Sequence, residues 1–355
     1  MTNTVVQTFL DLAKIDSPSG NEEAVAAYII NFLKNYGTES IKDKYGNVVS
    51  RIYGDGEPIV ITGHMDTVEP GRNIKPVIED GIIKSDGTTI LGADNKAWLA
   101  AMLETLRLCS GQKGVRNVDL VFTRQEEEGN GGSSHLDLRL LRGKRGFSCD
   151  DGSPLGAIFV KSPFYIKIDI SVIGKSAHSA EPEKASNALK AAAEAIHVLP
   201  LGDIGYKTIR NIGIMNSGQG RNTIPGQVNL VAEIRSFSKD YLNYATAEMI
   251  NTFREITEKH KCTIRKKVEL ENPGFEVDLS DSTLSEAKMA MTTLGITPRL
   301  EETYGCFDAN YFNGRGLHII NMSDGSVDSH TTLERIAICD LEKLQKLTET
   351  LMTVS

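Results

Sequence analysis

The chain has 355 residues, 40% hydrophobic and 24% charged, a composition typical of a folded globular protein. This length exceeds the usual size of one compact core and favours two domains. The net charge of −8 argues against nucleic acid or an anionic membrane as the main partner, because both bind basic surfaces.

The cysteines and the N-terminus indicate the cellular compartment. The five cysteines are widely spaced and include no CxxC pair, which argues against a disulfide framework. The first residues form an amphipathic helical pattern and lack the features of a signal peptide. No apolar run approaches the roughly 20 residues that a membrane span needs. The sequence therefore predicts a cytoplasmic protein that does not act on a membrane.

Helical and strand patterns alternate in the first part of the chain. Helices are expected at 4–14 and from the turn SPSGNEE to about residue 36, and strands at 47–53 and 58–63. The segment NKAWLAAMLETLRL carries an apolar stripe that predicts a strong helix. Strand VDLVFT, short helix LDLRLL and strand GFSCD follow. This alternation predicts an α/β domain with a mainly parallel sheet and helices on both faces.

The middle of the chain changes character near Tyr165. Strands are expected at about 165–174, 209–215, 227–237 and 262–271, with helices at 183–198 and 239–260. This pattern predicts an inserted α+β domain at 165–271, which leaves through the linker ENPGF. Alternation then resumes, with a helix at 281–294, strand LHIINM and a final helix near 335–352. The first domain is thus discontinuous, residues 1–164 and 272–355.

Five short motifs place imidazole or carboxylate side chains beside apolar runs. They contribute His64 and Asp66, Asp94, Glu126 and Glu127, Asp150, and His330. Imidazole with carboxylate suits borderline metals such as Zn²⁺, and two such ions can activate one water molecule. Loops at the carboxyl ends of parallel strands meet in the ligand-binding crevice of such a sheet. The motifs together predict a hydrolytic two-metal site.

Single motifs have simpler alternatives. Asp66 could cap a turn and Asp94 a helix, and a run of three glutamates is usually a solvated loop. His330 taken alone is an ordinary loop histidine. The residues themselves leave open which of Glu126 and Glu127 binds metal and which takes a proton.

In this order, GHMDT, SDGTTILGADNKA, QEEEG, CDDG and HTTLE resemble the co-catalytic zinc exopeptidase family that includes peptidase T, carboxypeptidase G and acetylornithine deacetylase. The resemblance covers the whole chain and is strongest to the peptidase T-like branch, through DGTTILGADNKA and the FTxxEE context. It implies a catalytic domain with an inserted lid, and two divalent metal ions. Zn²⁺ is expected, with Co²⁺ or Mn²⁺ as alternatives.

The resemblance also implies the metal ligands. One ion would be held by His64, Asp94 and Asp150. The other would be held by Asp94, Glu127 and His330, so that Asp94 bridges the two.

Further roles follow from the same resemblance. Glu126 matches the general base and acid, and Asp66 matches the residue that orients His64. Asp150 is preferred to Asp151 as a ligand because its spacing to the following Leu-Gly pair fits related sequences. The complete ligand set motivates a hypothesis for the mechanism. Glu126 would accept a proton from water held by the two metals, the resulting hydroxide would attack the amide carbonyl, and Glu126 would return the proton to the leaving amine.

The inserted domain carries three residues that match family positions. GKSAHSAEPEKASNAL contains His178, which would stabilise the carbonyl oxyanion and in family dimers can come from the partner subunit. Asn222 in GQGRNTIPG and Arg235 in AEIRSF would bind substrate, Arg235 through a carboxylate. Without the resemblance, Arg235 is a surface residue of a strand. Because the residue that matches His178 can come from the partner subunit in family dimers, a homodimer through the lid is expected.

Two residues depart from the family pattern. Trp98 stands where many relatives have Gly, and it either anchors the helix or narrows the site. Glu128 replaces a small or branched apolar residue and adds charge near the metals. Both affect specificity more than activity, because neither removes a ligand or the base.

The expected function is metal-dependent hydrolysis of small peptides by a tripeptidase- or aminopeptidase-like exopeptidase. An N-acyl amino acid deacylase or desuccinylase of the same family is the alternative, because both reactions hydrolyse an amide. A non-catalytic binding protein on this fold is a further alternative, and the loss of a ligand or of the base would indicate it. None is lost here.

Overall fold

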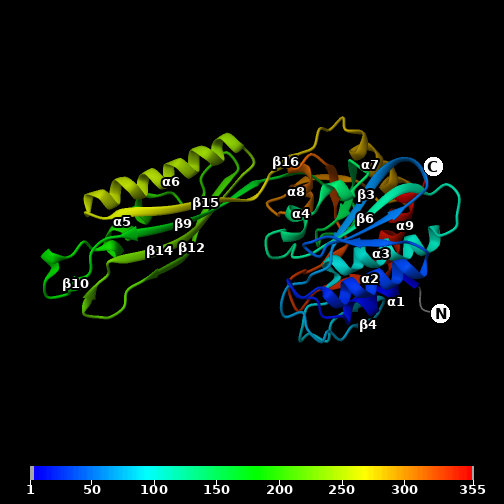
Figure 1. Ribbon diagram of the computed structural model, residues 1–355, viewed down its shortest axis with the longest axis horizontal. Helices are drawn as coiled ribbons and strands as arrows, with labels where there is room; N and C mark the ends of the chain where they lie inside the picture. The colour runs from blue at the N-terminus through cyan, green and yellow to red at the C-terminus, as the bar shows by residue number, and fades with distance from the viewer. Residues whose placement is uncertain (1–3, 354–355) are drawn as a thin grey trace. The chain divides into compact units, whose positions relative to one another are not determined.

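The computed structural model describes residues 4–353 and divides into two compact units (Figure 1). The first unit comprises the chain up to Lys161 and again from Glu276, and the second unit is Ser162–Phe275. The expected insertion, 165–271, lies inside the second unit. No helix within the described residues is long and apolar enough to cross a membrane.

The first unit is built around a nine-stranded sheet with the order β1-β2-β6-β3-β7-β18-β8-β16, and β17 pairs with β8. Its four central strands are parallel: β6 (Arg116–Thr123), β3 (Asp55–His64), β7 (Arg145–Cys149) and β18 (His318–Met322). On one side, β1 (Ser40–Lys42) and β2 (Val48–Ile52) join antiparallel. On the other side lie β8 (Ala157–Ser162), antiparallel to β18, then β16 (Phe275–Glu276) and β17 (Arg299–Glu302).

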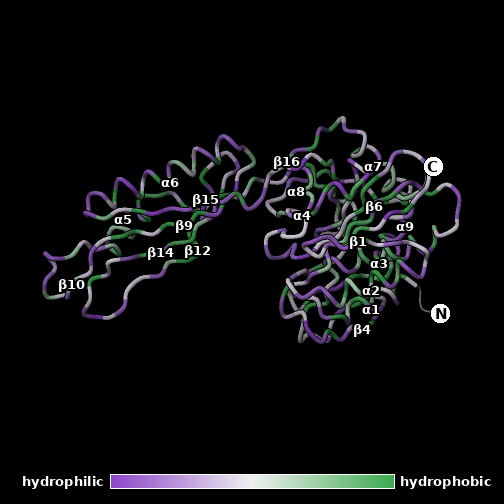
Figure 2. The backbone as a smooth tube through the Cα atoms, in the orientation of Figure 1, coloured by the Kyte–Doolittle hydropathy of each residue, from purple (hydrophilic) through white to green (hydrophobic). Residues whose placement is uncertain are grey.

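Helices cover both faces of this sheet. Because alternate strand residues point to opposite faces, Val60 and Gly63 of β3 lie on different sides. Gly63 faces α3 (Ala93–Cys109), where an added Cβ would lie 2.7 Å from Trp98. Val60 instead joins a core cluster with Phe312 of α8 (Asp308–Gly314). Figure 2 shows β6 and α3 as largely hydrophobic segments inside this unit.

The remaining helices of the first unit complete these two layers. Helix α3 packs against α1 (Thr4–Ala13), α2 (Glu23–Asn35) and α9 (Ile338–Met352), and α9 also packs against α7 (Ser282–Thr293). Helix α4 (Gly131–His135) packs against α8. A separate four-stranded sheet joins β19 (Ser326–Val327), β20 (Arg335–Ala337), β5 (Ile82–Lys84) and β4 (Val77–Glu79). It ties the chain after β18 to the segment that leads into α3.

The second unit has a five-stranded antiparallel sheet with helices on one face. The strand order is β11 (Gly202–Asp203), β12 (Thr208–Ser217), β14 (Gln227–Ser236), β9 (Phe164–Ile173) and β15 (Thr263–Asn272). Alternate residues of β9 and β14, such as Ile168 and Val228, pack against α5 (Ala188–Val198) and α6 (Lys239–Lys259). A two-stranded ribbon, β10 (Ala177–His178) with β13 (Thr223–Ile224), lies apart from the main sheet.

Three predicted helices have different bounds. The helix expected at 183–198 begins at Ala188, because the Asn187 side chain caps it by accepting from the Lys190 amide at 3.0 Å. Before it, Pro182–Lys184 forms a 3₁₀ turn (η2). LDLRLL yields only a three-residue 3₁₀ turn, Leu138–Leu140 (η1). The final helix begins at Ile338, because Arg335–Ala337 pairs with β5.

Candidate metal centre

The predicted ligands of the first unit converge from five separate segments. His64 is the last residue of β3, Glu126 and Glu127 follow β6, and Asp150 follows β7 directly. Asp94 lies in the first turn of α3, and His330 lies in the loop between β19 and β20. The carboxyl ends of three parallel strands therefore deliver four of these side chains to one place, and α3 and the β19–β20 loop bring Asp94 and His330 to it.

Two sets of ligand atoms share Asp94. His64, Asp94 and Asp150 form one set, and Asp94, Glu127 and His330 form the other, with the atoms of each set within 4.8 Å of one another. The Nε2 of His64 lies 3.1 Å from Asp94 Oδ1 and 3.8 Å from Asp150 Oδ1. The Nε2 of His330 lies 3.5 Å from Asp94 Oδ2 and 3.0 Å from Glu127 Oε2. The two oxygens of Asp94 thus face different imidazoles.

Buried negative charge dominates this cluster. Burial raises the pKa of Asp150 and of Glu126 well above the usual range, and neighbouring carboxylates raise both further. Hydrogen bonds to Asp94 and Glu127 raise the pKa of His330 to about 10. Burial alone would raise the pKa of Asp94, but hydrogen bonds from His330 and His64 bring it below its ordinary value.

The donor set fits divalent cations. The ion pairs of Asp94, Asp150 and Glu127 within residues 4–353 go to His64 and His330. A buried lysine, Lys96, instead donates to the Ile15 carbonyl at 2.8 Å. Carboxylates gathered in a low-dielectric site need a compensating positive charge, and imidazole with carboxylate is the donor set of zinc-type sites.

Asp66 holds both His64 and the loop after β6. The Nδ1 of His64 lies 3.0 Å from the Asp66 carbonyl oxygen and 3.4 Å from its Oδ1. The Asp66 carboxylate also accepts from the amides of Glu126 at 3.0 Å and Glu127 at 3.2 Å, and from the Ser19 hydroxyl at 2.6 Å. Asp66 thus contacts the His64 ring and also accepts from the turn after β6, so the two geometries that the sequence motif left as alternatives occur together.

Glu334 is a buried carboxylate to which the motifs assigned no role. It accepts from the backbone amides of Leu91 at 2.8 Å, Gly92 at 2.7 Å and Asp94 at 3.0 Å. These bonds fix the chain that presents Asp94. The only signal in the sequence was its place at the end of HTTLE, four residues after His330.

Trp98 and Glu128, the two departures, have different surroundings. Trp98 is fully buried and its Nε1 donates to the Thr62 carbonyl at 2.8 Å, so it anchors α3 on the sheet. Glu128 is exposed and lines a pocket of about 430 Å³ that also includes Glu127. In that pocket Glu69 pairs with Arg72 at 2.7 Å. Among the described residues Glu128 has no ion pair, so its charge in the pocket wall is not neutralised.

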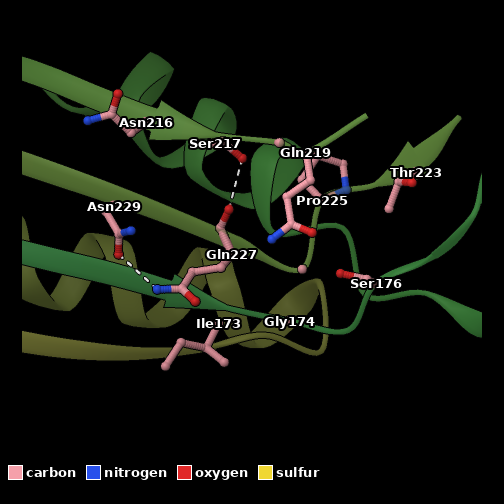
Figure 3. Close-up of a pocket in the computed structure, with 12 residues that line it drawn as sticks. Ile173, Gly174, Ser176, Asn216, Ser217, Gln219, Thr223, Pro225, Gln227 and Asn229 are labelled. Atoms are coloured by element: carbon pink, nitrogen blue, oxygen red, sulfur yellow. Dashed lines mark hydrogen bonds between the residues drawn. The ribbon is translucent and has the colours of Figure 1, made fainter. Parts of the chain in front are cut away.

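The second unit brings His178 and Asn222 together. His178 pairs with Thr223 across the β10–β13 ribbon, and the Ser179 amide donates to the Asn222 carbonyl at 2.9 Å. Thr223 also lines a pocket of about 660 Å³ at the start of β14 (Figure 3). Uncharged polar side chains line this pocket, among them Asn216, Ser217, Gln219, Gln227 and Asn229 (Figure 3).

Arg235 lies at the other end of this unit. It is next to the last residue of β14, pairs across the sheet with Tyr165, and lies 4.6 Å above the Tyr165 ring. Gln227 begins the same strand, eight residues earlier, so about 26 Å of extended chain separates the two positions. The three residues predicted in the insertion therefore do not form one cluster within the unit.

A mainly parallel α/β sheet, an inserted antiparallel unit and two imidazole–carboxylate sets sharing one aspartate are features of metallopeptidases with a lid. The chain belongs to Peptidase family M20/M25/M40, whose sequence model matches residues 60–354.

Three relatives define the resemblance more closely. The structure of aminopeptidase PepT from Bacillus cereus is 32% identical, with a TM-score of 0.91. That of a tripeptidase from Staphylococcus aureus is 31% identical, with a TM-score of 0.94, and each comparison covers 98% of this chain and 97% of the other. The uncharacterised protein YqjE of Bacillus subtilis is 31% identical over 97% of this chain and 96% of its own length. The predicted family, peptidase T-like branch, fold class and enzyme class, a metal-dependent exopeptidase, are confirmed.

Proposed function

We propose that this chain removes amino acids from short peptides, as a tripeptidase or aminopeptidase that uses two divalent metal ions. One observation carries the proposal: the two oxygens of Asp94 face His64 and His330, each within its own set of ligands. The similar solved structures are an aminopeptidase and a tripeptidase, which supports peptides as substrates. Zn²⁺ is the proposed metal, with Co²⁺ and Mn²⁺ as alternatives.

The proposed location is the cytoplasm. Cys109, Cys149, Cys262 and Cys339 form no disulfide bond, which is typical of proteins in a reducing compartment. Cell fractionation tests this proposal, and recovery of the protein outside the cytoplasmic fraction would contradict it.

Each of the two ligand sets that share Asp94 would hold one ion. His64, Asp94 and Asp150 would bind one, and Asp94, Glu127 and His330 the other. Bound divalent ions lower the pKa of water and polarise a carbonyl oxygen. Asp66, whose carbonyl oxygen contacts His64 Nδ1, would fix the ring with Nε2 facing Asp94.

Glu126 is proposed to move the proton. Its carboxylate lies within 4.8 Å of ligand atoms of His64 and Glu127, and burial raises its pKa. A carboxylate whose pKa is raised toward neutrality can take a proton from the attacking water and return it to the leaving amine.

The second unit is proposed to act on the substrate. The His178 imidazole would stabilise negative charge on the carbonyl oxygen, and Asn222 would bind the peptide beside it. Arg235 would bind a peptide carboxylate through two parallel hydrogen bonds. An extended tripeptide spans only about 10 Å, far less than the length of β14 between Gln227 and Arg235. We therefore propose that a dimer supplies His178 and Arg235 to one site from different subunits.

The substitution Glu126→Gln tests the assigned chemistry. We expect a loss of about 10²- to 10⁴-fold in kcat, with metal content measured by elemental analysis unchanged. Glu255→Gln on the exposed side of α6 is the matched control. High turnover in Glu126→Gln would refute the role of Glu126.

A substrate panel separates peptidase from deacylase. Tripeptides, dipeptides and N-acetyl or N-succinyl amino acids are compared with Zn²⁺, Co²⁺ or Mn²⁺ added. Cleavage of tripeptides with the highest kcat/KM supports the proposal. Exclusive cleavage of N-acyl amino acids would instead establish the deacylase. No hydrolysis of any member by metal-loaded protein would support a binding protein.

Complementation tests the dimer. His178→Ala and Arg235→Ala should each have little activity, because every site then lacks one group. Coexpression places both substitutions in one site of a heterodimer and leaves the other site intact, so random mixing should restore about a quarter of the sites. A mixture as inactive as its parents would exclude this pairing of subunits.

A further inference from the structure

The side chain of Asn130 is bonded to the carboxylate of Glu126. Its Nδ2 donates to Glu126 Oε1 at 2.7 Å, and both residues are more than nine-tenths buried. Within the described residues, Glu126 Oε1 has this bond, while Oε2 has no hydrogen-bond partner. One oxygen of the carboxylate is thus fixed by an amide and the other is left available.

A second buried carboxylate lies on the far side of the same amide. Nδ2 of Asn130 lies 3.4 Å from Asp308 Oδ1, and the hydroxyl of Thr123 donates to Asp308 Oδ2. An amide NH₂ group carries two hydrogens, so Asn130 can donate to Glu126 and Asp308 at once. Asp308 is 2% exposed and sits at the start of α8, far from Asn130 in the sequence.

We propose that Asn130, supported by Asp308, is a positioning residue that sets the orientation of the Glu126 carboxylate for proton transfer. This inference rests on the proposed role of Glu126. A glutamate without such a bond rotates about its side-chain torsions, and a misplacement of about 1 Å in a catalytic group can cost 10²-fold in rate. The bond to Oε1 restricts that rotation and leaves Oε2 to meet the water.

The side chain and the backbone of Asn130 have separable contributions. The loop after β6 is closed by the Asn130 amide, which donates to the Glu126 carbonyl at 2.8 Å, and by the Gly129 amide at 3.1 Å to the same oxygen. These bonds remain when the side chain is removed. Asn130 also has a φ of 55°, a left-handed conformation that glycine adopts without strain. Asn130→Gly therefore removes the side-chain amide group, while the backbone hydrogen bonds and the left-handed conformation of the turn are compatible with glycine.

The experiment compares Asn130→Gly with Asn73→Gly. Asn73 is exposed, has the same φ of 55°, and lies outside the cluster. For metal-loaded Asn130→Gly we expect kcat on a tripeptide to fall about 10- to 100-fold, with KM and bound metal within twofold of the wild type. Asn73→Gly should match the wild type. A kcat for Asn130→Gly within twofold of the wild type would overturn the inference.

A double-substitution cycle separates positioning from general damage. If Asn130 acts through Glu126, Asn130→Gly should cost nothing further once Glu126→Gln has removed the base. Equal losses with and without Glu126 would refute the inference. Asn130→Asp, which keeps the shape and replaces the donor by a carboxylate oxygen, is a second variant and should also lose kcat. If the wild type cleaves no peptide, the proposed function fails and the inference fails with it; an active wild type matched by both variants refutes the inference alone.

Discussion

Glu334 offers a quantitative test of how the chain holds Asp94. Its two oxygens accept three backbone N–H groups, from Leu91 and Gly92 on Oε2 and from Asp94 on Oε1. In Glu334→Gln one terminal atom becomes an NH₂ group, which cannot accept. Whichever way the amide turns, at least one buried N–H faces another donor.

The expected cost follows from that unpaired group. A buried donor left without a partner costs about 1–3 kcal/mol. Two further effects oppose each other: the remaining bonds lose an ionised acceptor, while the protein no longer buries a carboxylate whose pKa is raised by desolvation to about 7. We therefore expect the free energy of unfolding to fall by about 1–3 kcal/mol, and metal affinity to fall about 10- to 100-fold because Asp94 is less firmly held.

Urea unfolding of the metal-free protein measures the first quantity, and zinc titration of the folded protein measures the second. Glu57→Gln, in an exposed part of β3, is the control for loss of one carboxylate. If Glu334→Gln unfolds and binds zinc as the wild type does, the three N–H bonds neither stabilise the fold nor hold Asp94 for metal binding.

Three further predictions address the metals, the core and the pocket. Chelation should abolish peptide hydrolysis, and adding Zn²⁺, Co²⁺ or Mn²⁺ should restore it; activity that survives complete metal removal would contradict the metal-dependent chemistry. Trp98→Ala should lower the free energy of unfolding by about 3–5 kcal/mol, measured by urea unfolding, because it opens a cavity and removes the Nε1–H that donates to the Thr62 carbonyl. Glu128→Gln should raise KM about two- to fivefold for peptides with an N-terminal lysine or arginine relative to leucine, as expected for one solvent-exposed charge. An equal change for all these peptides would show that the charge of Glu128 does not discriminate.

The position of a site residue could be predicted from the sequence where that residue lies at or just after the end of an apolar strand. His64 ends an apolar strand, and Glu126, Glu127 and Asp150 each follow one closely, so the rule for ligand positions in parallel sheets applied directly. The alternating patterns likewise located central strands of the main sheet in each unit. Bounds were less accurate where tertiary contacts decide them, as at Arg335–Ala337, which joins a small sheet instead of starting α9.

Asn130, Asp308 and Glu334 could not be found in this way. Asn130 lies only four positions from Glu126, but its second partner, Asp308, is 178 positions away, and Glu334 binds an amide 240 positions away. No local spacing encodes such pairs, since they exist only once α8 and the loop before β20 have folded against the sheet. Asn130 in addition looks like an ordinary polar loop residue beside two glycines.

The acidic residues of the site divide into two groups that cannot be distinguished from the sequence alone. Asp94, Glu127 and Asp150 face the Nε2 atoms of His64 and His330, whereas Asp66 and Glu334 accept backbone N–H groups. The backbone groups held in this way belong to Glu126 and Glu127, and to Leu91, Gly92 and Asp94. Asp66 and Glu334 therefore fix the chain that presents Glu127 and Asp94. Substitution by the corresponding amide should separate the two groups experimentally. Replacing Asp94, Glu127 or Asp150 by the amide should weaken metal binding and relieve charge repulsion in the metal-free protein. The same replacement of Asp66 or Glu334 should leave buried N–H donors unpaired, and should therefore lower the free energy of unfolding even without metal.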